Sequence, residues 1–167
     1  MKKTLLFLFV GLLSFSSYAN TIKVDFEDLK KLEGKWIGTL NRTDGTSDIL
    51  NLEYSITSNG SAILEESNTG GIEMLSIFNA QNNEVVLTHY CGLQNKPVST
   101  LENLTNGVYV FKTDAKRSGL KKGKDMFVDN WKIQTMPEDS DKIIYEYTVI
   151  GPDGKGFTAV AEMQRVQ

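Results

Sequence analysis

The chain has little of the two side chains that most often carry chemistry. Among 167 residues there is one cysteine, Cys91, and one histidine, His89. A single cysteine cannot form an intramolecular disulfide, so the fold must depend on its hydrophobic core. Because an exposed lone thiol pairs between molecules in an oxidising compartment, we expect Cys91 to be buried or shielded. A zinc site here would need carboxylates as its remaining ligands, and we predict no metal.

The chain also lacks an apolar run of the ~20 residues that a membrane-spanning helix needs. Its first apolar run, Leu5 to Leu13, follows Lys2 and Lys3 and precedes a small-residue site that ends at Ala19. This pattern is typical of a bacterial secretory signal peptide over residues 1–19, cleaved near Ala19. We therefore expect a periplasmic or secreted protein with no membrane span.

Basic residues are in the minority, since the formal net charge is −3. A nucleic-acid-binding domain would show a basic face, so we expect no nucleic-acid partner. Residues 20–167 are enough for one domain with a core of its own, and they show no internal repeat or linker. We predict a single domain over this range, of unknown oligomeric state.

The rest of the pattern is that of an all-β protein. Asp25 is placed to cap a short helix in which Phe26, Leu29 and Leu32 recur at helical spacing and Gly34 ends it. Ten strand-length stretches follow, rich in β-branched and aromatic residues and separated by turn signals. They cover residues 35–42, 49–58, 62–68, 72–79, 84–91, 98–104, 108–113, 126–135, 142–150 and 157–166.

Most of these strands are joined by short turns, which leave no room for crossover helices. The sequence therefore predicts an antiparallel up-and-down β-barrel of about ten strands, because closure removes exposed edges. A two-sheet sandwich is the competing arrangement. The longest irregular stretch, residues 113–125, is basic. It is either a solvated loop at one end of the barrel, or else a mobile lid or a cationic mouth that attracts an anionic ligand.

The segment "LEGKWIGTL" resembles the opening of lipocalin-like (calycin) barrels, in which Gly-x-Trp starts the first strand after a short helix. Here these residues are Gly34 and Trp36. The resemblance implies that Trp36 closes one end of the barrel. Strand alternation places Trp36, Gly38 and Leu40 on one face, and glycine at position 34 lets the backbone pass close to whatever covers that end.

A second stretch is similar to a family of exported bacterial lipocalin-like proteins of unknown function. That family carries a Gly-Ser-Ala strand with a glutamate, a Glu-Met strand, and a His-Tyr-Cys strand followed by Gly, Asn and Pro. The matching residues are Gly60, Ser61, Ala62, Glu65 or Glu66, Glu73, Met74, His89, Tyr90, Cys91, Gly92, Asn95 and Pro97. This resemblance implies a fold and an exported location, but no activity.

The Gly-x-Trp-x-Gly opening also resembles that of nitrobindin-type haem barrels. Those proteins hold haem through a histidine near the C-terminal end of the chain. Residues 142–167 contain no histidine, which argues against haem binding by that route. Haem with His89 or Cys91 as its ligand stays open.

Strand alternation bears on His89 and Cys91 directly. The two residues share a face with Val85 and Leu87, so we expect His89 and Cys91 to point inward. The opposite assignment, with Val86 and Tyr90 inside, is the alternative. Neighbours two apart on a strand rarely form a Cys–His dyad. A buried histidine bonded to a carboxylate, Glu73 or else Glu65 or Glu66, is the simpler interpretation.

We therefore predict a barrel that binds a small hydrophobic or amphipathic molecule in its lumen, with no catalysis and no cofactor. The alternatives are a haem or cofactor carrier using His89, an enzyme using Cys91 or a Glu–His pair, and a filled barrel that acts through its surface. Whether the lumen is open or filled is not decided by the sequence. The predicted ligand-binding residues are Trp36, Glu73, Val85, Leu87, His89, Tyr90 and Cys91.

Overall fold

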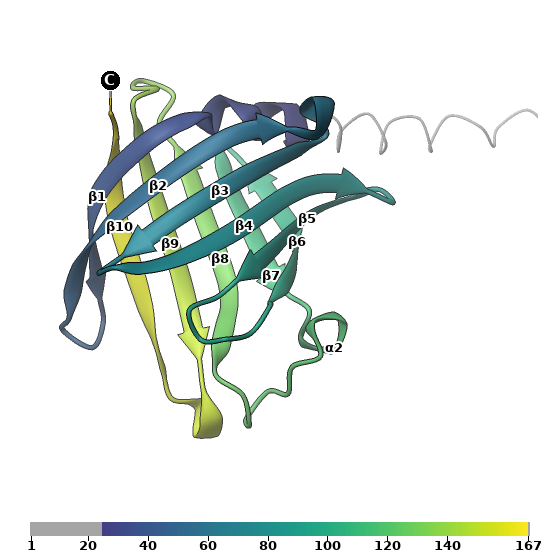
Figure 1. The fold of residues 1–167 in the computed structure, drawn as a ribbon, viewed down its shortest axis with the longest axis vertical. Coiled ribbons are helices and arrows are strands. Elements are labelled where there is room, and N and C mark those ends of the chain that lie inside the picture. Colours follow the sequence, from purple (N-terminus) through teal and green to yellow (C-terminus); the bar gives the residue numbers. More distant parts are fainter. Residues whose placement is uncertain (1–24, 167) are drawn as a thin grey trace, which may run out of the picture.

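Ten antiparallel strands close into a barrel in this computed structural model, which describes residues 25–166 (Figure 1). The strands are β1 (Gly34–Arg42), β2 (Ser47–Thr57), β3 (Ala62–Thr69), β4 (Ile72–Gln81), β5 (Glu84–Tyr90), β6 (Val98–Thr105), β7 (Val108–Thr113), β8 (Phe127–Thr135), β9 (Lys142–Ile150) and β10 (Gly156–Val166). Strand β1 pairs with both β2 and β10, so the sheet has no free edge. The predicted barrel is confirmed, and the sandwich is excluded.

The predicted strand ends agree with the structure to within two residues. Turn chemistry explains this agreement, because the hairpins turn at residues with positive φ, among them Asn82, Asn83, Asn106 and Gly107. The predicted signal peptide, residues 1–19, lies outside the described residues. Within the described part of the chain, no helix is long and apolar enough to cross a membrane.

One end of the barrel, which we call the base, is covered by helical residues 25–29 and the 3-10 turn η1 (Lys30–Leu32). Phe26, Leu29 and Leu32 are buried there in the core. The Trp36 Nε1–H donates to the Leu32 carbonyl at 2.8 Å. Trp36 therefore closes this end, as the Gly-x-Trp resemblance implies.

Gly34 connects η1 to β1 with a φ of +122°, a conformation that L side chains rarely adopt. A Cβ at this position would lie 2.9 Å from an Arg165 guanidinium nitrogen. The group that lies close to the Gly34 backbone is thus the side chain of Arg165, on β10.

The opposite end, which we call the mouth, carries the loops at residues 43–46, 70–71, 91–97, 114–126 and 151–155. In Figure 1 the mouth is at the bottom and the base at the top. The basic segment 113–125 is not wholly irregular, because it contains the one-turn helix α2 (Ala115–Ser118). Asp114 Oδ1 accepts from the Arg117 amide at 3.0 Å, and Gly119 ends the turn at φ +73°. The sequence carries this cap and stop signal in Asp114 and Gly119.

Candidate functional site

Large apolar side chains fill the barrel interior toward the base, and a cavity lies toward the mouth. Near the base, Phe78 meets Phe111 edge-on with ring centroids 5.6 Å apart, and the Tyr54 ring centroid lies 6.3 Å from that of Phe78. Toward the mouth, the walls enclose a cavity of about 260 Å³. That volume lies just below the ~300–1,000 Å³ usual for ligand sites. The barrel is thus filled in one half and hollow in the other.

Apolar side chains form most of the cavity wall, among them Leu50, Val128, Trp131, Val149 and Phe157. Strand alternation explains this, because inward-facing positions of β2, β8, β9 and β10 carry large apolar residues that the mouth leaves uncovered. Polar groups are few and lie at separate places in the wall. They come from Arg42, Asp48, Ser67, Thr69, His89, Cys91, Tyr145 and Tyr147.

A row of polar side chains crosses four neighbouring strands at the inner limit of this cavity. The register pairs Tyr54 with Glu65, Glu65 with Ser76, and Ser76 with His89. The Tyr54 hydroxyl donates to Glu65 Oε2 at 2.6 Å, and the Ser76 hydroxyl donates to Glu65 Oε1 at 2.7 Å. Ser76 Oγ lies 2.9 Å from His89 Nδ1. All four residues are buried.

Tyr145 joins this row from β9, on another part of the wall. Its hydroxyl lies 3.3 Å from Glu65 Oε1. Three hydroxyl groups therefore point at one buried carboxylate. Burial raises the pKa of Glu65, and the three hydroxyl donors oppose that rise by stabilising the carboxylate.

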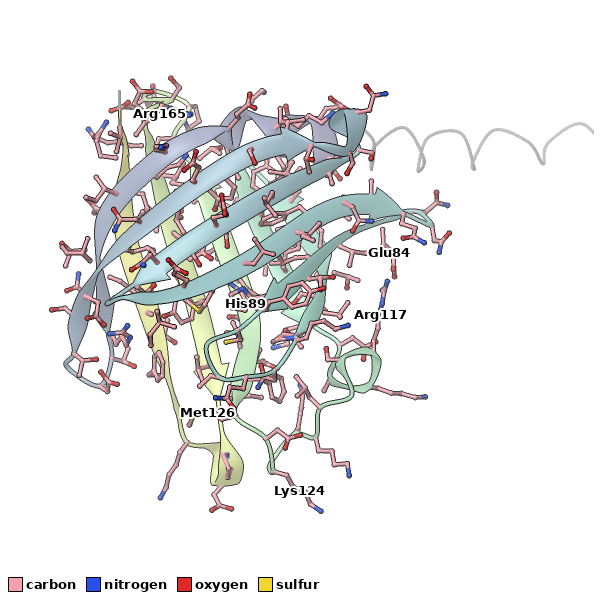
Figure 2. The ribbon with its side chains drawn as sticks, in the orientation of Figure 1. Glu84, His89, Arg117, Lys124, Met126 and Arg165 are labelled. Atoms are coloured by element: carbon pink, nitrogen blue, oxygen red, sulfur yellow. The ribbon has the colours of Figure 1, made fainter. Side chains whose placement is uncertain are left out.

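His89 lies mid-barrel with its ring toward the interior, as Figure 2 shows. The ring meets Trp131 edge-on, with centroids 5.2 Å apart and an interplanar angle of 64°. Burial lowers the pKa of His89 to about 4, because a charged imidazole loses its hydration there. The site therefore holds a neutral imidazole at physiological pH.

The predicted ligand-binding residues fall in three places. His89 and Cys91 line the cavity, and Cys91 is only partly buried. Trp36, Val85 and Leu87 are buried in the packed core and do not line it.

Glu73 and Tyr90 lie on the outer wall, where Tyr90 is 47% exposed. The alternation that turns His89 inward turns Tyr90 outward. Both residues border a shallow outer hollow of about 810 Å³, lined mainly by β1 to β4 with Tyr90 of β5 and Val166 of β10. Of the three glutamates considered as partners of His89, Glu65 is the one that connects to it, and it does so through Ser76.

The mouth rim carries one cation close to the cavity. The Arg42 guanidinium contacts Asp48 at 2.7 Å and lies 5.9 Å from the centre of the Phe157 ring. Arg42 and Asp48 also line the cavity. The charges of Arg42 and Asp48 thus neutralise each other beside the cavity.

At the base, the Arg165 cation packs on an aromatic ring. Figure 2 shows it at the end of the barrel opposite Met126 and Lys124. Its guanidinium carbon lies 4.1 Å from the centre of the Trp36 ring. It also donates to backbone carbonyls of Lys31, Glu33 and Ser140 and to the Asp141 carboxylate. Sequence reasoning missed this residue, because a single arginine in a late strand has no distinguishing pattern.

Among the described residues, no cluster of three or more His, Cys, Asp and Glu side chains is placed to hold a metal ion. The thiol of Cys91 has a raised pKa because of its burial, so the protonated form is favoured. Such a thiol is a weak nucleophile.

The sequence matches no protein-family model. No curated protein sequence matches it either.

Solved structures show the fold clearly. The chain resembles a protein of unknown function from the DUF3598 family of Nostoc punctiforme, with a TM-score of 0.59 and 12% identity over 83% of this chain. It spans 49% of that longer protein.

Rv2717c from M. tuberculosis gives a TM-score of 0.57 at 14% identity, covering 85% of this chain and 97% of its own. The S-type phycobiliprotein lyase CPES of Guillardia theta gives 0.53 at 11%, covering 93% and 99%. These likenesses show the fold alone, which is a closed antiparallel barrel consistent with the lipocalin-like, or calycin-like, type.

Proposed function

We propose that this protein binds one small, largely apolar molecule with at least one polar group in the cavity at its mouth. The observation that carries the proposal is the cavity of about 260 Å³ in a barrel whose other half is tightly packed. Natural interiors leave few voids larger than a water molecule. A cavity this large, with an apolar wall and a few polar groups, is the usual form of a ligand site.

The wall indicates how binding would work. Apolar contact with Trp131, Phe157 and Val128 would supply most of the affinity, at about 25 cal/mol per Å² of apolar surface buried. His89, Ser67 and Tyr147 would fix the orientation. The cavity of about 260 Å³ lies just below the usual range for ligand sites, so the ligand would be compact.

Binding without chemistry is part of the proposal. Cys91 favours its protonated thiol form, and His89 lies beside Ser76 rather than in a Cys–His pair. The leader-like N-terminus supports an exported, periplasmic or secreted carrier.

Haem is the second candidate that His89 raises. The cavity of about 260 Å³ lies below the ~300–1,000 Å³ of ordinary small-molecule sites, and a porphyrin with its iron and propionates is larger than most such ligands. The residues present therefore do not fit haem in this arrangement. A haem titration should show no Soret shift that His89→Ala abolishes.

Native mass spectrometry on protein purified from its own host is the direct test. We expect a small molecule to copurify with the wild type and to be lost in Ser67→Phe, which fills the cavity. Asn68→Phe is the matched control, because position 68 is next along β3 and faces outward. An empty wild type, or equal loading of both variants, would contradict the proposal.

A further inference from the structure

The polar row at the inner limit of the cavity determines which nitrogen of His89 carries a proton. Glu65 is fully buried and has three hydroxyl groups within hydrogen-bond distance, those of Tyr54, Ser76 and Tyr145. In each of these contacts the hydroxyl is the donor and a Glu65 oxygen is the acceptor. Each of the three hydroxyls therefore uses its single hydrogen on Glu65.

Ser76 then has no hydrogen left for His89. Its oxygen lies 2.9 Å from His89 Nδ1, so it acts there as the acceptor. A neutral imidazole has one N–H and one bare nitrogen. Nδ1 must therefore carry the proton, and Nε2 keeps a free lone pair.

The bare nitrogen has no partner in the described part of the chain. Within the described residues, the imidazole ring hydrogen-bonds at Nδ1, to Ser76. Nε2 is not fully buried, so it borders open space. His89 is also one of the residues that line the cavity. The edge-on contact with Trp131 fixes the ring plane. The lone pair thus points from a fixed ring toward the ligand space.

We propose that His89 Nε2 accepts a hydrogen bond from the ligand, and that Glu65 enforces this acceptor role through Ser76. This inference rests on the proposed function. It specifies the ligand class as an apolar body with a hydroxyl or N–H group at its inner end, such as an alcohol, a phenol, an indole or an amide. A ligand that presents only acceptors there, such as an ether or a ketone, would leave both its own group and Nε2 without a partner.

The first experiment measures the tautomer without any ligand. In untagged protein His89 is the only histidine, so a ¹⁵N–¹H correlation spectrum of labelled imidazole is unambiguous. We expect a protonated Nδ1 and a bare Nε2 at pH 7. Ser76→Ala should shift the equilibrium toward protonated Nε2. Ser99→Ala is the matched control, because Ser99 is a buried serine that bonds Thr113 instead. Protonated Nε2 in the wild type would overturn the inference.

The second experiment uses two probes that differ by one donor, 2-naphthol and 2-methoxynaphthalene, in calorimetric titrations. The wild type should prefer 2-naphthol by about fivefold or more, the value of one ordinary hydrogen bond. Ser76→Ala should reduce this ratio toward one, and Ser99→Ala should keep it. Equal binding of both probes by the wild type would overturn the donor requirement alone. Failure of both probes, together with an empty cavity in mass spectrometry, would overturn the proposed function itself.

Discussion

The hydroxyl of Tyr145 on β9 lies 3.3 Å from the carboxylate of Glu65 on β3, so two separate parts of the barrel wall meet in one hydrogen bond. This contact separates the packed base from the hollow mouth. It also gives the buried carboxylate a third hydroxyl donor, beside those of Tyr54 and Ser76. The polar row is therefore a structural element as well as a candidate part of the site.

Removing the carboxylate should be costly. Glu65→Ala leaves the hydroxyls of Tyr54, Ser76 and Tyr145 without their shared acceptor, and we expect the free energy of unfolding to fall by about 3 kcal/mol. The next residue supplies the control, because Glu66 is exposed. Glu66→Ala should change stability by less than about 0.5 kcal/mol. Denaturant unfolding measures the free energy of unfolding of both variants. Equal losses in Glu65→Ala and Glu66→Ala would contradict the role given to Glu65.

Stability should depend on pH through His89. Between pH 6.5 and about 4, the unfolded chain takes up a proton at His89 that the folded chain does not. The free energy of unfolding should therefore fall as the pH falls through this window, by up to about 3 kcal/mol. Burial raises the pKa of Glu65, which acts in the opposite direction.

The contribution of His89 is isolated by comparing the wild type with His89→Gln. Denaturant unfolding from pH 7 to pH 4 should show a steeper loss in the wild type. The imidazole resonances of the wild type should also stay in the neutral form down to about pH 5. An ordinary midpoint near 6.5 would show that the ring is not buried as described.

Two buried threonines should respond in opposite directions to the same substitution. Thr69 Oγ1 is buried without a hydrogen-bond partner, so Thr69→Val should stabilise the ligand-free protein by up to about 1 kcal/mol. The Thr113 hydroxyl donates to the Val128 carbonyl at 2.7 Å and contacts Ser99. Thr113→Val should instead destabilise by about 1 kcal/mol or more. Thermal melts of the two variants provide the comparison.

The base should depend on Arg165 for more than its charge. Arg165→Ala removes the contact over Trp36 and four sets of hydrogen bonds, and we expect a loss of about 2 kcal/mol or more. Arg165→Lys should recover little of that loss, because an ammonium lacks the planar fork.

The exposed pair of Lys35 and Glu53, 3.4 Å apart, supplies the reference for an ordinary ion pair. Lys35→Ala should change stability by under about 1 kcal/mol. Probe binding at the mouth should be unchanged in folded Arg165→Lys. A full rescue by lysine would contradict the stacking argument.

Strand alternation and turn residues were sufficient to predict the barrel and the inward direction of His89. They did not select Glu65 from three glutamates, because that choice depends on the register that sets Glu65 opposite Ser76 and Ser76 opposite His89. The role of Ser76 could not be predicted from the sequence, because a single serine in a strand belongs to no recognisable motif. Tyr145 joins from β9, and its contact depends on how the ring of strands closes.

The position of the cavity was also beyond the sequence. The cavity exists because side chains near Trp36 and Phe78 fill the lumen, whereas those around Trp131 and Val149 leave it open. Such a difference depends on summed volumes in three dimensions. The motif that contains Glu73 and Tyr90 does not place them in the cavity, because their strand positions face outward.

The division of this barrel into a packed half and a hollow half has a consequence for how it can change. Residues that hold the protein together, such as Trp36 and Arg165, occupy the base, whereas Ser67, Val128 and Phe157 line an open space at the mouth. Under the proposed function, substitutions at the mouth would alter ligand preference, and those outside the buried core cluster, such as at Ser67, would affect folding least. An engineer could recruit the same scaffold for new small molecules by varying those positions alone.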